Sequence, residues 1–274
     1  MLMRIGANSY GKSECRLVRI DRRARAHRIQ DLTVSTSLAG SLDKVHLDGD
    51  NTGVLPTDSQ KNTVYGFARR GIDSIEAFGL ELARHFVDTQ HSIHRATVAI
   101  EQTMWHPVDD ISFRRGGELT RIATVRVDGP QAEVTGGLTG LTLLKSTDSE
   151  FQGFARDRFT TLPPAADRVL ATSVDARWRF GRIEGVDWDK VFDLAHQALV
   201  QAFAGTYSRS LQQTLYAMGE AALDACPELT EIHLSLPNKH HFLVDLTPFG
   251  MDNPDVVYYA ADRPYGLIEG TVSR

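Results

Sequence analysis

The sequence predicts an α+β protein built from two consecutive ββααββ units. Segments in which polar and apolar residues alternate, as in half-buried strands, stand before and after pairs of segments with helical apolar spacing. The same order occurs twice, and the division falls at the turn signal Asp128-Gly129-Pro130. Strands and helices that come in blocks favour antiparallel sheets with helices packed on one face. The predicted units are residues 1–129 and 130–274.

The first unit carries four predicted strands and two helices. The strands have alternating or β-branched apolar residues and cover 16–20, 32–35, 97–100 and 121–127. The helices are predicted over 58–70 and 73–90. Asp73 and Glu76 resemble a capping box at the start of the second helix. Spacings of three and four place the apolar residues of that helix on one face, which consists of Ile75, Phe78, Leu82 and Phe86.

The second unit repeats this order. Its strands are predicted at 131–145, 168–180, 232–236 and 256–260. An amphipathic helix is predicted over 187–203 and another over 210–225. The apolar face of the first helix consists of Trp188, Val191, Phe192, Ala195, Leu199 and Phe203. The apolar face of the second carries Leu211, Leu215 and Met218.

Composition excludes several classes of protein. The 274 residues are 42% hydrophobic and 24% charged, which is ordinary for a globular protein and excludes a collagen, a coiled coil or a disordered chain. The formal net charge of −5 lacks the basic footprint of a non-specific nucleic-acid binder. No run of ~20 apolar residues is present, so no membrane-spanning helix is expected.

The cysteines and the termini predict a cytoplasmic protein. Cys15 and Cys226 match neither a zinc site nor a redox pair, and we expect two reduced, partly buried thiols. The beginning of the chain has no apolar signal core. The C-terminal residues Val272-Ser273-Arg274 differ from the peroxisomal signal Ser-Lys-Leu.

The histidines do not predict a metal site. His91 and His94 stand near each other at the end of a predicted helix, whereas His240 and His241 point to opposite faces of an extended chain. Three convergent ligands are not found, and neither HExxH nor paired CxxC occurs. The sequence also lacks a phosphate loop, a dinucleotide fingerprint and a nucleophile elbow.

Three polar clusters remain as candidate sites, at residues 10–12, 55–62 and 236–242. In the second, Pro56 sets an extended entry, and Thr57 or Asp58 takes the N-cap position of the helix. Either these residues only cap the helix, or the free N–H groups and positive dipole at its start attract an anionic ligand. In the third, a strand with period two directs Asn238 and His240 to the same side. A plain polar loop is the alternative.

Short motifs extend this pattern along nearly the whole chain. They are Tyr10-Gly11-Lys12, Pro56-Thr57-Asp58-Ser59 with Lys61-Asn62-Thr63, Leu144-Lys145-Ser146-Thr147 with Phe151 and Gly153-Phe154, Arg156-Asp157 with Thr160-Thr161-Leu162, Asp167-Arg168, Gln212 with Thr214 and Tyr216, and Ser235-Leu236-Pro237-Asn238-Lys239-His240. In this order the motifs resemble the urate oxidase (uricase) family.

The resemblance implies the tunnelling fold, with two ββααββ units in each chain. It further implies a homotetramer whose antiparallel sheets close into a β-barrel around a tunnel, with the helices outside; such closure removes exposed sheet edges. The implied reaction is the oxidation of urate by oxygen and water to 5-hydroxyisourate and hydrogen peroxide, in purine degradation. No metal or organic cofactor is implied, because the electron-rich urate anion can itself reduce oxygen while the protein binds, deprotonates and orients it.

The resemblance also implies a clamp on the purine edges. Arg168 matches an arginine whose planar guanidinium donates two parallel bonds to an anionic edge. An ion pair with Asp167 is the alternative role of Arg168. Gln212 matches an amide that both donates to and accepts from another edge. Leu211 matches a main-chain contact at a place where the family often has valine.

Three further residues match the rest of the substrate site. Phe151 matches a ring that stacks over the purine, an interaction worth about 1 kcal/mol, with ordinary core packing as its alternative. Leu162 matches an apolar wall of the same pocket, and Asp58 matches a main-chain contact to the purine.

A proton relay completes the implied site. Lys12 and Thr57 match the pair that acts as base, since a lysine of lowered pKa accepts a proton through a neighbouring hydroxyl. His240 continues the relay because imidazole takes and gives protons near neutral pH. Asn238 matches the donor that faces the oxygen or water position above the purine.

The resemblance places each site between chains, with Lys12 and Thr57 from one chain and the purine clamp from another. Two other functions remain as alternatives. One is a different tunnelling-fold enzyme acting on a purine or pterin, some of which use zinc. The other is an oligomer that binds a purine without catalysis, which would keep the clamp and could lose the relay. The presence of Lys12, Thr57 and His240 favours the enzyme.

Overall fold

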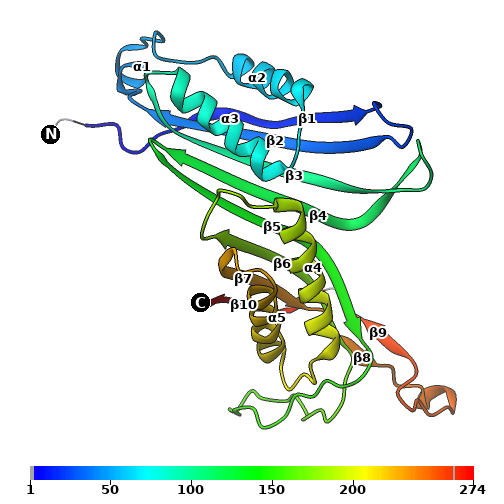
Figure 1. Ribbon diagram of the computed structural model, residues 1–274. Helices are drawn as coiled ribbons and strands as arrows, with labels where there is room; N and C mark the ends of the chain where they lie inside the picture. The colour runs from blue at the N-terminus through cyan, green and yellow to red at the C-terminus, as the bar shows by residue number, and fades with distance from the viewer. Residues whose placement is uncertain (1–2, 262) are drawn as a thin grey trace. The chain divides into compact units, whose positions relative to one another are not determined.

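The computed structural model describes residues 3–261 and 263–274, and the order of its elements contains ββααββ twice (Figure 1). Two compact units are present. One runs to Gly137 and includes Arg179–Val191, and the other comprises Leu138–Trp178 and Phe192–Arg274. The order of elements repeats after the turn at Gly129, whose φ is 53°. The proposed division into 1–129 and 130–274 stays a prediction.

The strands of the first unit lie where the sequence predicts them, and each is longer. Their order is β1-β2-β3-β4, with antiparallel pairing throughout; the bounds are β1 (Tyr10–Asp21), β2 (Arg28–Gly40), β3 (Ile93–Pro107) and β4 (Phe113–Asp128). The two predicted helices are α2 (Thr57–Arg70), which packs against β1, and α3 (Ile75–Thr89), which packs against β3 and β4 (Figure 1). A short helix, α1 (Asp43–Asp48), was not predicted.

The predicted apolar face of α3 is confirmed, but its predicted cap is wrong. The four residues of that face are each at most 2% exposed. The N-cap is Ser74, whose hydroxyl accepts a hydrogen bond from the N–H of Ala77 at 3.1 Å. Glu76 does not close a capping box because its carboxylate turns inward and pairs with Arg121 of β4 at 2.7 Å.

Arg121 joins α3 to the segment Arg179–Val191, which belongs to the first unit. Its guanidinium contacts Glu76 at 2.7 Å and Asp189 at 2.6 Å, and both Glu76 and the side chain of Arg121 are almost fully buried. Burial raises the pKa of Glu76, while the charge of Arg121 opposes this rise. We expect Arg121→Ala to lower the free energy of unfolding by about 3 kcal/mol or more, because it leaves a buried carboxylate unpaired. Denaturant titration measures the change, and a loss below about 1 kcal/mol would contradict it.

The second unit follows the same plan. Its strand order is β5-β6-β7-β10, formed by β5 (Gln131–Lys145), β6 (Leu170–Phe180), β7 (Leu229–Asn238) and β10 (Gly266–Ser273). The helices are α4 (Trp188–Gly205) and α5 (Leu211–Ala225), and α5 packs against β7 and β10 (Figure 1). All nine residues of the two predicted apolar helix faces are buried, at 9% exposure or less.

The last strand of the sheet lies later than predicted. Residues 258–260 form β9 (Tyr258–Ala260), which pairs with β8 (His241–Leu243) in a separate ribbon, with a 3-10 turn, η1 (Thr247–Phe249), between them. The strand that pairs with β7 is β10. Its alternation is hidden in the sequence by Gly270, where an added Cβ would lie 3.0 Å from a methyl group of Leu215. Close helix packing therefore favours glycine in a row that otherwise carries apolar side chains.

Both thiols are buried and free, as expected. In the part of the chain that the structure describes, every helix is too short or too polar to span a membrane. The cytoplasmic location stays a prediction from the sequence.

Candidate active site

The first two polar clusters meet in the first unit. Strand β1 begins with Tyr10, and its phenol oxygen accepts a hydrogen bond from the N–H of Leu55 at 2.9 Å, directly before α2. Two residues after Tyr10, Lys12 lies half-buried on the same strand. The electrostatic field of Lys12 reaches Asp58, where it contributes to the lowered pKa of that carboxyl. The structure therefore places Lys12 beside the start of α2.

Helix α2 starts without a side-chain cap. Its N-cap is Pro56, so the prediction that Thr57 or Asp58 caps the helix is wrong. The extended backbone of Pro56 lets its carbonyl accept the first helical bond, from the N–H of Gln60 at 3.1 Å. The N–H groups of the three residues in between precede this bond, and such groups stabilise an anion at a helix N-terminus. The anion-binding alternative of the sequence analysis stays a prediction.

The carboxylate of Asp58 bonds to side chains of its own helix. It pairs with Lys61 and accepts a hydrogen bond from the Asn62 amide at 2.9 Å. The hydrogen bond from Lys61 is the main reason that the pKa of Asp58 is lowered. Because the side chain already has partners, a role of Asp58 toward a ligand would fall to its main chain, as predicted.

Arg168 and Phe151 form the centre of the candidate site in the second unit. The guanidinium carbon of Arg168 lies 5.4 Å from the centroid of the Phe151 ring. The Nε atom of Arg168 is buried and has no hydrogen-bond partner among the described residues. Burial also lowers the pKa of Arg168. Since a buried donor without a partner costs about 1–3 kcal/mol, the arrangement indicates a place for an acceptor from outside the chain.

Asp167 does not pair with Arg168. Its carboxylate accepts hydrogen bonds from the hydroxyl of Thr147 at 2.6 Å and from the N–H of Ser149 at 3.3 Å. The bond from Thr147 is the main reason that the pKa of Asp167 is lowered. Asp167 therefore anchors the loop between β5 and β6, and the alternative role of Arg168 as its ion-pair partner is not supported among the described residues.

The loop holds Phe151 in a defined place. The main-chain N–H of Phe151 donates to the carbonyl of Ala165 at 2.9 Å, and the N–H of Ala165 donates to the carbonyl of Phe151 at 3.0 Å. The ring stacks on Phe154, with centroids 5.0 Å apart and planes 11° from parallel. Phe151 is half-buried rather than part of the core, and Leu162 of the same loop is 51% exposed. Both residues can therefore contact a ligand.

Hydrogen bonds tie this loop to the start of α5. Glu150 donates its N–H to the carbonyl of Ser208 at 2.7 Å, and the hydroxyl of Thr214 donates to Ser208 Oγ at 2.8 Å. On the first turn of α5, Leu211 is buried and Gln212 is exposed. The sequence does not predict this role of Ser208, because a single serine outside the motifs gives no signal.

His240 stands near Arg168. The strand β7 ends at Asn238, so a period of two does not extend to His240 and the shared direction of the two side chains stays a prediction. The N–H of Lys239 donates to the carbonyl of Ala171 at 2.8 Å, which fixes the segment beside β6. Burial lowers the pKa of His240, and the positive charge of Arg168 lowers it further.

We expect His240 to titrate below 6.5, the ordinary pKa of histidine. Its imidazole is then neutral at pH 7 and can accept a proton. Removing the positive charge in Arg168→Gln should raise the pKa, because a cation disfavours the imidazolium form. NMR titration of the imidazole protons, assigned with His240→Gln, measures both values. A pKa that falls or stays constant in Arg168→Gln would contradict the coupling.

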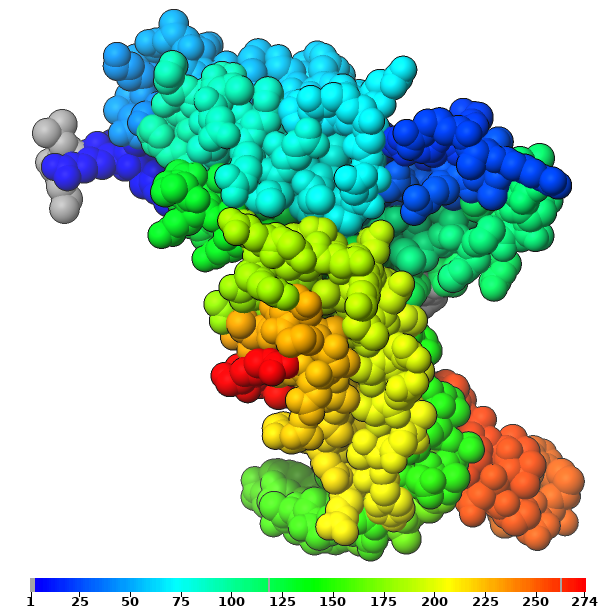
Figure 2. Space-filling view, viewed as in Figure 1, coloured from blue at the N-terminus to red at the C-terminus, as the bar shows by residue number. Residues whose placement is uncertain are grey.

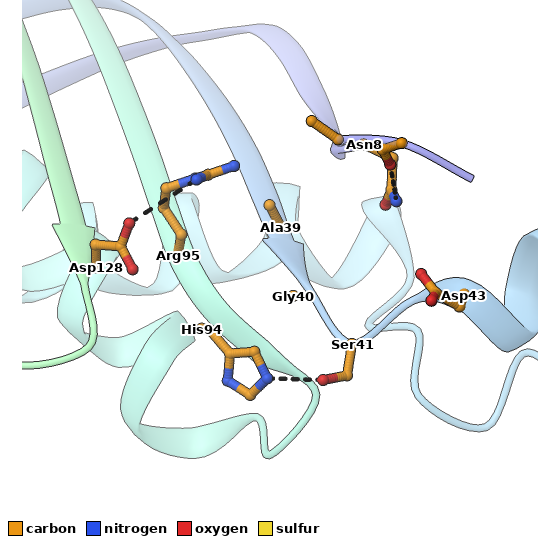
Figure 3. Close-up of a pocket in the computed structure, with 10 residues that line it drawn as sticks. Asn8, Ala39, Gly40, Ser41, Asp43, His94, Arg95 and Asp128 are labelled. Atoms are coloured by element: carbon orange, nitrogen blue, oxygen red, sulfur yellow. Dashed lines mark hydrogen bonds and ion pairs between the residues drawn. The ribbon is translucent and has the colours of Figure 1, made fainter. Parts of the chain in front are cut away.

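A separate hollow of about 380 Å³ lies in the first unit (Figure 3). Four of its polar side chains contact each other in pairs: Ser41 and His94 are 2.8 Å apart, and Arg95 lies 3.8 Å from Asp128. None of the predicted site residues lines it. The candidate site is therefore the pair of clusters described above and not this hollow.

Within the described residues, no group of three or more His, Cys, Asp or Glu side chains could hold a metal ion. The predicted absence of a metal or cofactor stays a prediction.

A family model described as Uricase matches residues 8–131 and 134–269. The chain belongs to the uricase family. The uricase of Arthrobacter globiformis is 49% identical over 98% of this chain and 90% of its own length, and that of Danio rerio is 37% identical over 97% and 93%. The predicted family is thereby confirmed.

Solved structures agree with this assignment. The crystal structure of the Arthrobacter globiformis uricase has a TM-score of 0.97 and 48% identity, and the match covers 100% of this chain and 96% of the other. A urate oxidase from Bacillus sp. TB-90 has a TM-score of 0.82 over 97% and 100% of the two chains. At 22% identity, that likeness concerns the fold alone. The predicted α+β tunnelling fold of the uricase family is confirmed.

Proposed function

We propose that this chain oxidises urate with oxygen and water to 5-hydroxyisourate and hydrogen peroxide, as a cytoplasmic enzyme of purine degradation. The observation that carries the proposal is the buried Nε of Arg168, which has no hydrogen-bond partner in the described part of the chain and lies beside the ring of Phe151. A flat anion would stack on the ring and accept from the guanidinium with its edge. Gln212 would hold another edge, with Leu211 and Asp58 offering main-chain groups and Leu162 an apolar wall.

The reaction balances without an electron carrier in the protein. Urate gives two electrons and two protons to oxygen, which becomes hydrogen peroxide, and the oxygen atom of water becomes the 5-hydroxyl group. Lys12 takes a proton from the ligand through the Thr57 hydroxyl, and His240 passes protons onward. Asn238 donates toward the oxygen or water above the purine plane. Fixed donors of this kind stabilise the charges that develop during the reaction.

The most direct test adds urate in air and follows its ultraviolet absorbance and hydrogen peroxide together. We expect both to change in equal molar amounts, before and after exhaustive treatment with chelators. Urate that binds without being consumed would instead identify a purine-binding oligomer without catalysis. Activity that disappears with the chelator and returns with zinc or copper would favour a metal-dependent enzyme of the same fold.

We further propose a homotetramer whose sheets close into one barrel. The strands β1 and β10 each end the strand order of their own unit, so their outer main-chain groups are available to pair with another copy. Exposed apolar residues also gather in the segment after β7, whose surface Figure 2 shows in orange; they are Phe242, Leu243, Phe249, Met251, Val256, Val257 and Tyr259. Exposed apolar residues that gather in one segment are typical of a contact between proteins.

Shared sites make a specific prediction. Lys12 and Thr57 belong to the first unit, whereas Arg168, Gln212 and His240 belong to the second. If each site combines the first unit of one copy with the second unit of another, mixing Lys12→Ala and Arg168→Ala chains should restore partial activity. Hybrids purified with two different affinity tags provide the material. Verified hybrids without recovered activity would contradict the shared site.

A further inference from the structure

We propose that Gln60 and Thr36 form a buried positioning pair that holds the main chain of Lys12 against the first turn of α2. The pair thereby sets how Lys12 meets Thr57. The inference rests on the proposed function, because this geometry matters for turnover only if Lys12 and Thr57 exchange a proton. All four residues lie in the first unit.

Gln60 departs from the pattern of its helix. The buried residues of α2 are spaced by four and comprise Gln60, Val64 and Ala68. Such a stripe is ordinarily apolar because it faces the core. Gln60 nevertheless has no exposed surface. Because a buried amide costs free energy unless its hydrogen bonds are made, glutamine at this place indicates a specific partner.

That partner is Thr36 of β2, which is 4% exposed. The hydroxyl of Thr36 donates to Gln60 Oε1 at 2.7 Å and accepts from the main-chain N–H of Lys12 at 3.3 Å. A hydroxyl has only one proton to donate. The carbonyl of Lys12 also lies within reach of this hydroxyl, at 3.4 Å, but Gln60 Oε1 at 2.7 Å is the much closer acceptor. With the proton directed to Gln60, a lone pair of the oxygen faces the N–H of Lys12. The hydrogen bonds therefore run in one direction, from Lys12 through Thr36 to Gln60.

Strand β1 needs these side-chain acceptors because its regular pairing stops at Lys12. The register shifts in a bulge after the pair Lys12 and Thr36. Within the bulge Glu14 has a φ of 56°, and its N–H donates to the hydroxyl of Ser35 at 2.9 Å. Hydroxyl groups of β2 thus serve as acceptors for the N–H of Lys12 at the start of the bulge and for the N–H of Glu14 within it. Bulges next to active sites commonly direct a side chain in this way.

A close main-chain contact between β1 and β2 also fixes the strand next to Lys12. A Cβ added to Gly11 would lie 1.8 Å from the main-chain oxygen of Thr36, so only glycine permits this approach of β1 to β2. Leu55, two residues before Thr57, has both its main-chain polar groups bonded. Its N–H donates to Tyr10, and its carbonyl accepts from Gln60 Nε2 at 3.4 Å. Gln60 therefore contacts the entry to Thr57 directly and reaches the strand of Lys12 through Thr36.

The test compares Thr36→Val and Gln60→Leu, singly and together. Each single change leaves a buried polar group without its partner and should lower Tm. The double variant replaces both partners with apolar groups of similar shape, so much of the Tm should return. We expect its kcat to stay on the order of tenfold below wild type, with the Kd for urate unchanged, because a small displacement of a catalytic group slows the reaction.

Two variants serve as controls. Thr36→Ser keeps the hydroxyl and should retain kcat. Thr33→Val removes another hydroxyl of β2, one that accepts from Arg16 and not from Lys12, and should also leave kcat unchanged. A double variant with wild-type kcat would overturn the proposal. If the double variant does not fold, Gln60→Asn, which keeps the amide but shortens its reach, should show the same fall in kcat, and an unchanged kcat would overturn the proposal equally.

Lys12→Ala, measured in parallel, separates this inference from the proposed function. If Lys12→Ala keeps its kcat, the relay itself is wrong. If Lys12→Ala loses turnover while the double variant keeps it, only the positioning role of Gln60 and Thr36 is wrong.

Discussion

Lys12→Ala should lower kcat by about a hundredfold to ten-thousandfold, the usual contribution of a positioned acid or base. The Kd for urate should change much less, because proton transfer matters in the transition state and not in the bound ground state. Thr57→Ala should act in the same direction, since its hydroxyl is proposed to carry the proton between ligand and lysine. Steady-state kinetics and equilibrium binding of urate under nitrogen measure the two quantities separately.

Lys44→Ala is a suitable control for this experiment. Lys44 is an exposed lysine of α1 in the same unit, and its removal changes the net charge equally. It should leave both kcat and Kd as in wild type. A Lys12→Ala enzyme that loses affinity and turnover by the same factor would show that Lys12 binds urate and does not relay a proton.

Arg168→Ala should lower kcat/KM for urate about a hundredfold or more and should weaken binding of urate itself. The reason is that the guanidinium lies beside the Phe151 ring and that its Nε is buried without a hydrogen-bond partner among the described residues. Truncating one partner of a buried charged hydrogen bond typically costs about 2–5 kcal/mol. Arg168→Lys should also lose most of the affinity, because an ammonium cannot donate two parallel bonds to a planar edge.

The same loop offers a matched control for Arg168. The guanidinium of Arg158 lies 4.5 Å from the ring centroid of Phe159, but Phe159 is 72% exposed. Arg158→Ala should therefore leave urate binding unchanged. Calorimetry with each variant measures the affinities. Equal affinities in Arg168→Ala and wild type would remove Arg168 from the clamp.

The sequence predicted the helices and their buried faces well, because helical periodicity is a local property. Ile75 to Phe86 and Trp188 to Phe203 show their apolar spacing without knowledge of the partner strands. The alternation of strand β10 is interrupted in the sequence by Gly270, at a position where the helix residue Leu215 leaves little room for a side chain. That requirement comes from packing between segments that lie far apart in the sequence.

The two predicted helix starts failed for a similar reason. Capping patterns indicate a helix start only to within one or two residues. Glu76 matches a capping residue in the sequence, but in the fold its carboxylate bonds to Arg121, which no local pattern indicates. At α2 the extended backbone of Pro56 forms the N-cap, and the hydroxyl of Thr57 does not cap the helix.

The order of the polar motifs indicated the family and the candidate residues, and the spacing of the apolar residues indicated the repeated unit, because residue types and spacings are read directly from the sequence. Only the tertiary structure decided which of these groups have partners. Asp58 pairs with Lys61, and Asp167 accepts a hydrogen bond from Thr147 of its own loop. The Nε of Arg168 has no acceptor among the described residues. The fold also connects Gln60 to Lys12 through Thr36. Hydrogen bonding and desolvation depend on neighbours that folding brings together, and sequence spacing carries no record of them.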